Sequence, residues 1–484
     1  MMRMWHDNWR AAGLTMLALG ILGLSAPGTR AQQQPRDQQP SSGQSGAPIP
    51  AYHAPLLSGD NSEAEDNAQE PPDTRQLAGV QTLGLRGLDR SRSYWQPRID
   101  LSATGDSNAG QSTGSTSNWA TWTSFAGGMD VQQISGGSEL TLGYTGGFTY
   151  STDGSHPTGI VQQLNFSDKF VFRRATVTLL DQFGYLPEQN FGFGGLGGVA
   201  LPGGMTTGLG SGVSPGQTIL AGRGQNITNT YVTELDLSVT PRSSLTFAGG
   251  YSTLYYFDSN LVDTMNVMGR VGYNYELSRR NTLAVLYNVQ AIRYKGFPQS
   301  VDDHRAQVAY GRRVTGRLAF QIAGGPEVAM FHTPISSTAT STTNVYWSLN
   351  TALQYELRRN HFAVDYSHGV SGGAGVLAGA INDTASGSVT HLMSRTFSSG
   401  ITGGYARNNG LTTGKITSNQ NYNYWFTGAT LSHPVGRTLG LTLSYQMQYQ
   451  DSNAPFCIGP TCSTSMIRHT ISFGLGWHER PLLF

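Results

Sequence analysis

The chain has 484 residues and a net charge of +1, with 13% charged and 38% hydrophobic residues. So few charges would cover the surface of a soluble protein poorly, and a helical membrane protein would need apolar runs of about 20 residues. A net charge this close to zero gives no electrostatic reason to expect nucleic acid as a partner. Composition therefore argues against a string of soluble domains and against a helical membrane protein.

The N-terminus carries the one long apolar run, residues 11–26. Arg3 and Arg10 precede it and Ala31 follows it, a layout typical of a secretory signal peptide. We expect residues 1–31 to be this peptide, with cleavage after Ala31 and Ala26 as the second choice. An N-terminal anchor helix is the alternative, but the run is shorter than the ~20 residues of a membrane span.

Residues 32–95 show neither helical nor strand periodicity. Gln32–Pro50 is rich in Gln, Pro, Ser and Gly, and Asp60–Asp73 is acidic. Such a stretch cannot bury enough apolar surface to offset the entropy cost of ordering. We expect a disordered periplasmic tail, with docking to the cell wall or to a partner as the alternative.

Residues 96–484 form the third predicted unit, and most of its strands alternate between two faces. In 438–450 the odd positions are Leu, Tyr or Met and the even positions are Thr, Gly, Ser or Gln. Because strand side chains point to opposite faces with period two, one face is apolar and the other is wettable. The pattern recurs in segments of ~10–14 residues, long enough for tilted strands that cross a bilayer.

We count eighteen such segments, with 16 as the alternative because the second, fourteenth and sixteenth mix their two faces. They are 98–105, 119–133, 138–151, 159–167, 175–186, 227–240, 243–257, 264–277, 281–294, 303–313, 317–331, 343–357, 361–370, 383–394, 396–407, 422–433, 438–450 and 466–478.

The connections alternate between two kinds. Short, mostly arginine-containing turns (240–242, 278–281, 312–313, 357–360, 394–395 and 434–437) alternate with long polar loops (106–118, 152–158, 187–226, 332–342, 408–421 and 451–465). Lipid offers no hydrogen-bond partners, so a sheet in the bilayer must close on itself. The sequence therefore predicts an all-β fold, a single closed antiparallel transmembrane β-barrel with short periplasmic turns, long outer loops and both termini in the periplasm.

This layout resembles the bacterial outer-membrane β-barrels of the porin type. The resemblance covers residues 98–484 and includes the terminal Phe484, although Pro481 interrupts the last strand pattern. The chain also resembles uncharacterised barrels of soil and exopolysaccharide-producing bacteria. The resemblance implies a Gram-negative outer membrane, contact with its lipid and lipopolysaccharide, and insertion by the barrel-assembly machinery. Whether copies associate into a homo-oligomer stays open.

Charges of both signs lie on the alternates that face the predicted lumen. A barrel of 16–18 strands leaves an aqueous channel whose wall charges tune which solutes pass. The alternative is that these charges only pair with one another across the wall. The mixture of signs predicts weak ion selectivity. The residues are Glu139, Glu234, Asp236, Arg270, Glu276, Arg305, Arg317, Glu327, Glu356 and Asp365.

The third outer loop, 187–226, contains thirteen glycines and almost no charge. The porin resemblance implies that this loop folds into the barrel as a constriction, and the alternative is a surface loop. Cys457 and Cys462 lie in another outer loop, where an oxidising compartment favours a disulfide. Two free thiols or a metal site are the alternatives, but the loop holds no histidine and we expect no metal.

We expect no catalysis and no cofactor. The segment from Asp365 to Gly373 brings Asp, His and Ser together in sequence, yet Asp365 and His368 would face opposite sides of a strand. Two hypotheses follow. The first is a porin-like channel for passive passage or export of hydrophilic solutes, and the second is a non-conducting structural or adhesion barrel, linked in one variant to exopolysaccharide export.

Overall fold

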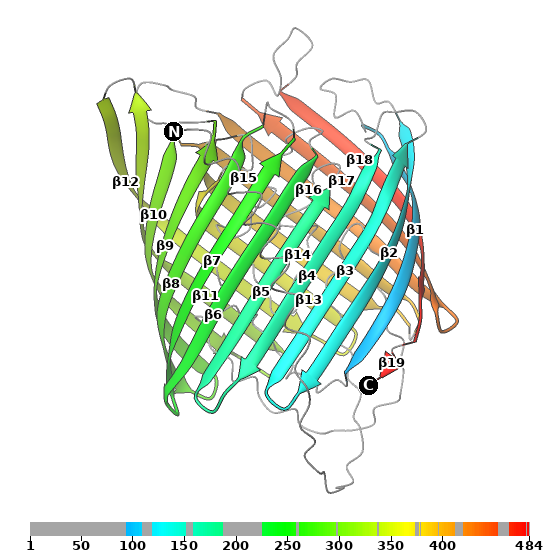
Figure 1. Ribbon diagram of the computed structural model, residues 1–484, viewed down its shortest axis with the longest axis horizontal. Coiled ribbons are helices and arrows are strands. Elements are labelled where there is room, and N and C mark those ends of the chain that lie inside the picture. The colour runs from blue at the N-terminus through cyan, green and yellow to red at the C-terminus, as the bar shows by residue number, and fades with distance from the viewer. Residues whose placement is uncertain are drawn as a thin grey trace, which may run out of the picture. The chain divides into compact units, whose positions relative to one another are not determined.

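One closed antiparallel sheet forms the body of the protein. The computed structural model describes residues 93–108, 119–151, 158–186, 225–257, 261–296, 299–335, 338–372, 377, 379–394, 396–411, 420–453, 464–480 and 482–483. Strand β1 (Tyr94–Asp106) pairs with β2 (Ala120–Ser135) on one side and with β18 (Ser465–His478) on the other, which closes the barrel (Figure 1). No helix in these ranges is long and apolar enough to cross a membrane.

Eighteen long strands follow one another around the barrel, so the predicted count is confirmed. A two-residue strand, β19 (Leu482–Leu483), also pairs with the start of β1. The remaining strands are β3 (Ser138–Ser151), β4 (Gly159–Val171), β5 (Ala175–Leu186), β6 (Asn226–Thr240), β7 (Ser243–Tyr256), β8 (Asp263–Ser278), β9 (Asn281–Lys295), β10 (Ser300–Arg313), β11 (Leu318–Ile335), β12 (Thr338–Glu356), β13 (Asn360–Ser371), β14 (Ala380–Leu392), β15 (Ser398–Gly410), β16 (Asn421–Val435) and β17 (Leu439–Ser452).

The two ends of the barrel differ in their connections. At the turn end, tight turns join consecutive strands, as at Pro241–Arg242 and Arg279–Arg280, and Tyr94 and Leu483 lie at this same end. Gly436 has a φ of +76° in the turn after β16, a conformation that glycine adopts without a steric penalty. At the opposite, loop end, most connections lie outside the described residues.

One predicted outer loop is wrong. Residues 332–342 were expected as a loop, but β11 continues to Ile335 and β12 begins at Thr338, and the two strands pair throughout. The segment is rich in threonine, whose β-branched side chain favours a strand even where the composition looks loop-like.

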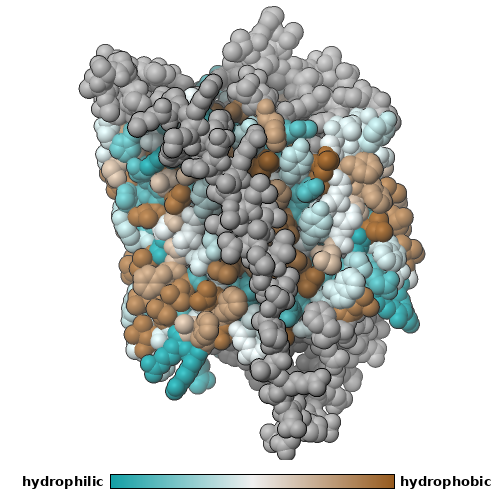
Figure 2. Space-filling model, in the orientation of Figure 1, coloured by the Kyte–Doolittle hydropathy of each residue, from teal (hydrophilic) through white to brown (hydrophobic). Residues whose placement is uncertain are grey.

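The two faces of the wall differ as the alternation predicts. In β8, Val271 and Tyr273 are each 46% exposed on the outer face, whereas Asn274 and Arg270 are buried on the inner face. On β9 the outward side chains are apolar from Leu283 to Ala291, and charged Arg293 and Lys295 follow. This span matches the ~9–11 residues that a tilted strand needs to cross a bilayer. On the side that faces the viewer, Figure 2 shows hydrophobic residues gathered at the lower left and on the right of the wall.

Ion pairs mark the loop-side limit of the apolar band. Arg293 pairs with Asp302 at 2.7 Å, and His332 contacts the same aspartate at 3.2 Å. Lys295 pairs with Asp263 at 3.4 Å. Charged side chains on an outward face are costly within lipid and cost little at its interface. These residues therefore mark the edge of the hydrocarbon region on the side of the loop end.

Candidate functional site

The inner wall of the barrel is the candidate site, because the described polar and charged residues concentrate there. Nine of the ten predicted lumen residues lie on strands with inward-facing parity: Glu139 on β3, Glu234 and Asp236 on β6, Arg270 and Glu276 on β8, Arg305 on β10, Glu327 on β11, Glu356 on β12 and Asp365 on β13.

Arg317 is the exception. It lies in the exposed turn before β11, which begins at Leu318. The predicted strand started one residue too early, because the sequence shows no sharp boundary between the turn and the first wall residue. Arg317 therefore belongs with the arginines of the turn end.

Arg305 is the centre of a buried network on the wall formed by β9, β10 and β11. Its Nε lies 2.6 Å from an Asp303 oxygen and 2.7 Å from a Glu327 oxygen. A second guanidinium nitrogen donates to Gln290 at 3.1 Å and to the carbonyl oxygen of Val370 at 2.9 Å. A buried charge is tolerated only when it is paired and hydrogen-bonded. Because these four partners satisfy the guanidinium from different sides, they fix its position.

A second polar row runs around the wall from β8 to β12. Arg270 donates to Asn288, Asn288 donates to Gln307 at 3.3 Å, and Gln307 donates to Ser348 at 3.0 Å. Ser348 in turn donates to the carbonyl oxygen of Gly325 at 3.1 Å. The row links four strands through side chains, in addition to their backbone hydrogen bonds.

Other inner-wall charges were missed in the sequence. Arg98 pairs with Asp130 at 2.7 Å and also donates to Thr145. Near the seam where β18 meets β1, the Arg468 Nε donates to Asp106 at 2.7 Å, and both side chains are almost fully buried. Strand parity would have found Arg98 and Arg468, since their neighbours Ile99 and Ile467 face outward.

Near the loop end, β13 separates from β12 and lies against the inner wall of β10 and β11, while β14 stays paired with β15. β12 pairs with β13 only from Glu356 to Leu349, whereas β13 and β14 stay paired up to Ser371 and Ala380. Beyond His368, β13 therefore has no partner in β12. We call residues 369–372 and 379–382 the inner hairpin end.

The inner hairpin end is bound to the inner wall of β8–β11. The backbone N–H of Val370 donates to Glu327 at 3.0 Å, and its carbonyl oxygen accepts from Arg305. The Val370 side chain is fully buried in an apolar cluster with Ile292, Val301 and Phe331. Polar and apolar contacts thus both hold this segment inside the barrel.

Two glycines permit the close approach. A Cβ at Gly369 would lie 3.1 Å from a carboxylate oxygen of Glu327, so a side chain there would press on the buried ion pair. Gly379 has a φ of +95°, and a Cβ there would lie 3.2 Å from the Tyr294 hydroxyl. Only glycine meets both the steric and the backbone requirement at this second position.

The segment considered for catalysis divides between the two faces. His368 lies on the outer face, where it stacks on Trp347 with ring centroids 3.8 Å apart and contacts Asp383 at 2.5 Å. Ser367 lies on the inner face, beside Thr384. The segment therefore does not assemble a Ser–His–Asp triad. No cluster of metal-ligating side chains occurs in the ranges that the structure describes.

Several predicted features lie outside the described residues. They are the signal peptide, almost all of the N-terminal tail, nearly all of the glycine-rich loop 187–226, Cys457, Cys462 and Phe484.

No protein-family model matches the chain, and no curated protein matches it. Among solved structures it is similar to OccK2 (OpdF) of Pseudomonas aeruginosa in complex with glucuronate, at 9% identity and a TM-score of 0.40, over 81% of this chain and 98% of that one. It is also similar to OccAB4 of Acinetobacter baumannii, at 6% identity and a TM-score of 0.40, over 80% and 98% of the two chains. Identities this low do not transfer a substrate or a binding residue.

Proposed function

We propose that this porin-type barrel is an outer-membrane channel for the passage of hydrophilic solutes. The observation that carries the proposal is the contrast between the two faces of one wall. The outer face is apolar over the length of a bilayer crossing, and the inner face holds paired charges and hydrogen-bonded amides and hydroxyls. A polar inner face is typical of closed barrels whose lumen holds water and passing solutes.

The proposal includes an orientation. The turn end, with both termini of the barrel, faces the periplasm, and the loop end faces outward, as short turns and long loops are distributed in barrels of this kind. Contact with lipopolysaccharide and insertion by the barrel-assembly machinery follow from this location. The proposal gives the barrel no catalytic role and needs no cofactor.

We assign the constriction to the inner hairpin end. Arg305 and Glu327 hold it against the inner wall of β10 and β11, so it occupies cross-section that would otherwise belong to the lumen. The glycine-rich loop 187–226 stays a second candidate for the same role. Because several of the described lumen charges occur in opposite-sign pairs, we expect a narrowing that selects solutes by size more than by charge.

Conductance of the purified protein in planar lipid bilayers tests the channel. We expect stepwise insertions, each with an ohmic current, and a larger single-channel conductance when residues 373–378 are replaced by a two-glycine link. A matched deletion in the β15–β16 loop, residues 412–419, should leave the conductance within the scatter of the parent protein. A correctly folded barrel without conductance, in both the parent and the deletion variant, would favour the non-conducting surface barrel.

A further inference from the structure

The inner wall of β14, β15, β16 and β17 carries no charge along the strand residues that the structure describes. The charged side chains and histidines of these four strands all have outward parity: Asp383, His391, Arg407, His433 and Asp451. The inward alternates are mostly hydroxyls, amides, glycines and aromatic rings. We call this inner face of β14–β17 the neutral sector, in contrast to the charged networks on the inner wall of β6–β13.

Charges return on both sides of the neutral sector. Asp365 lies on the inner face of β13, which precedes it. On β18, which follows it, the Arg468 guanidinium already donates to the buried Asp106 of β1. The neutral sector is therefore a continuous stretch of wall with defined edges.

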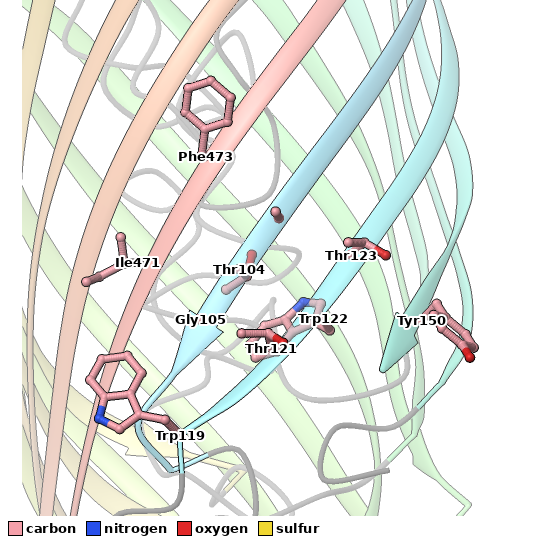
Figure 3. Close-up of a pocket in the computed structure, with 10 residues that line it drawn as sticks. Thr104, Gly105, Trp119, Thr121, Trp122, Thr123, Tyr150, Ile471 and Phe473 are labelled. Carbon is pink, nitrogen blue, oxygen red and sulfur yellow. The ribbon is translucent and has the colours of Figure 1, made fainter. Parts of the chain in front are cut away.

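The alternation of faces continues across the seam beside this sector (Figure 3). Ile471 and Phe473 on β18 are exposed on the outer wall. Ser472, between them, forms a hydrogen bond of 2.8 Å with Thr104 of β1 on the inner wall. Uncharged hydroxyls thus continue from β17 toward the seam.

An aromatic pair and an unpaired amide lie together in the loop half of the neutral sector. Tyr424 and Phe426 on β16 both face inward, with ring centroids 6.1 Å apart and an angle of 26° between the ring planes. Gln448 on β17 lies directly opposite Phe426. It is 1% exposed, and neither its amide nitrogen nor its amide oxygen has a hydrogen-bond partner. Buried side-chain amides are normally paired, so an unpaired one facing a lumen indicates a partner from outside the chain.

Space for a solute lies beside these residues, toward the turn end. A Cβ at Gly400 on β15 or at Gly440 on β17 would have no atom within 4 Å. Gln446 and Ser444, the inward residues that follow Gln448 toward the turn end, are partly exposed. Inward residues of one strand recur about every 7 Å. Neutral donors and acceptors therefore lead from the open half of the sector to the aromatic pair.

The chemistry of this face suits a sugar without charge. The C–H face of a sugar ring packs on an aromatic ring, and its hydroxyls donate and accept hydrogen bonds as amides and serine hydroxyls do. A charged solute would find no counter-charge on these strands, and unpaired charges are costly to desolvate. An apolar solute would leave the Gln448 amide without a partner.

We propose that the neutral sector binds neutral, polyhydroxylated solutes as they pass through the barrel. Phe426 is the stacking surface, and Gln446 and Gln448 exchange hydrogen bonds with the solute hydroxyls. The proposal rests on the channel function given above and names the class of solute. Binding and conductance are separate measurements, so each statement can fail without the other.

Calorimetric titration of the purified barrel with raffinose, a neutral trisaccharide, tests binding without any current. The barrel is held in a detergent that has no sugar headgroup. We expect saturable binding in the parent protein and about tenfold weaker binding in Phe426→Leu, which keeps an apolar side chain but removes the ring face. Gln446→Leu should weaken binding several-fold.

Gln321→Leu is the matched control. Gln321 is an inward residue of β11, so the same change is made on the inner wall outside the neutral sector. Its affinity for raffinose should equal that of the parent, and heat-modifiable gel mobility verifies that each variant folds. A parent protein that does not bind raffinose, or equal affinities in the Phe426 and Gln321 variants, would overturn the proposal.

Single-channel current separates the solute class from the channel function. We expect raffinose to reduce the open-channel current more than a polyethylene glycol of the same hydrodynamic radius, which lacks hydroxylated rings. Phe426→Leu should abolish this difference. A conducting barrel that responds equally to the two solutes would contradict the proposal and leave the channel function intact. A barrel that binds raffinose in the titration but passes no current would support the binding face and contradict the channel.

Discussion

At the scale of single residues, Arg305 is the side chain that the fold constrains most. It bonds two carboxylates, one amide and one backbone carbonyl, which belong to β9, β10, β11 and the inner hairpin end. Removing it would leave Asp303 and Glu327 as close, buried and uncompensated acids. Breaking a buried ion pair in this way costs about 3–5 kcal/mol, whereas exposed pairs contribute about 0–1 kcal/mol.

We therefore predict that Arg305→Met lowers the free energy of unfolding by about 3–5 kcal/mol. Urea unfolding, followed by the gel mobility of the folded barrel, measures the change. Arg293→Met is the matched control, since Arg293 pairs with Asp302 but is 44% exposed. Similar losses of unfolding free energy in the two variants would show that burial of the Arg305 network does not increase its contribution to stability.

Asp365 provides the residue-scale test of the lumen. It lies on the inner face of β13, with Ala352 as its cross-strand partner. We predict that Asp365→Asn shifts ion preference only slightly toward anions, because one wall charge is screened over ~8–10 Å at ordinary salt. Reversal potentials across a salt gradient measure the shift. Arg317→Gln in the exposed turn should leave the reversal potential unchanged. A large change of the reversal potential in either variant would contradict the expected weak ion selectivity.

At the scale of elements, the inner hairpin end is the part of the barrel that departs from a regular wall. Its location can be tested by a disulfide between Thr264→Cys on β8 and Gly372→Cys, in a background with Cys457 and Cys462 changed to serine. A Cβ at residue 372 would lie 3.2 Å from the Cγ2 methyl of Thr264, which is one bond from the Thr264 Cβ. The two Cβ atoms are therefore close to the ~3.5–4.5 Å separation that a disulfide needs.

We predict that this cross-link forms on mild oxidation without loss of the folded gel mobility. A control pair, Thr264→Cys with Ser399→Cys on β15, should not form. If the first pair also fails in a folded barrel, the hairpin end does not rest on β8.

The loop that carries Cys457 and Cys462 gives a second prediction at this scale. A disulfide there closes a short loop, and such bonds stabilise the whole fold little because the effect grows with loop length. We predict that thiol reagents fail to label either cysteine before reduction and label both after it. The urea concentration at the midpoint of unfolding should be the same for the oxidised and the reduced protein. Labelling of both cysteines in the unreduced protein would show that no bond forms.

At the scale of the whole molecule, the barrel combines three environments within a wall one strand thick. Lipid contacts the outer face, polar networks cover the inner face, and at least one apolar cluster, around Ile292 and Phe331, lies inside. The inner cluster exists because the hairpin end covers it. A simple two-faced wall would have left these side chains facing water.

The local sequence predicts much of this architecture. The strict alternation in 438–450, repeated from strand to strand, determined the strand count, the two faces and the strand parity of nine wall charges. Period-two patterning is local, since each side chain's face depends only on its place in its own strand. The same reasoning failed at Arg317 and at 332–342, where turn and strand compositions overlap.

Tertiary structure alone decided where β13 separates from β12 and which strands close the barrel. The contact of Arg305 with Val370 joins residues 65 positions apart, and closure depends on β18 meeting β1 at the seam. Neither arrangement has a local signature, because each results from which strands become neighbours and where their pairing stops. Alternation reports the face of a residue, and only the closed barrel determines what lies opposite that face.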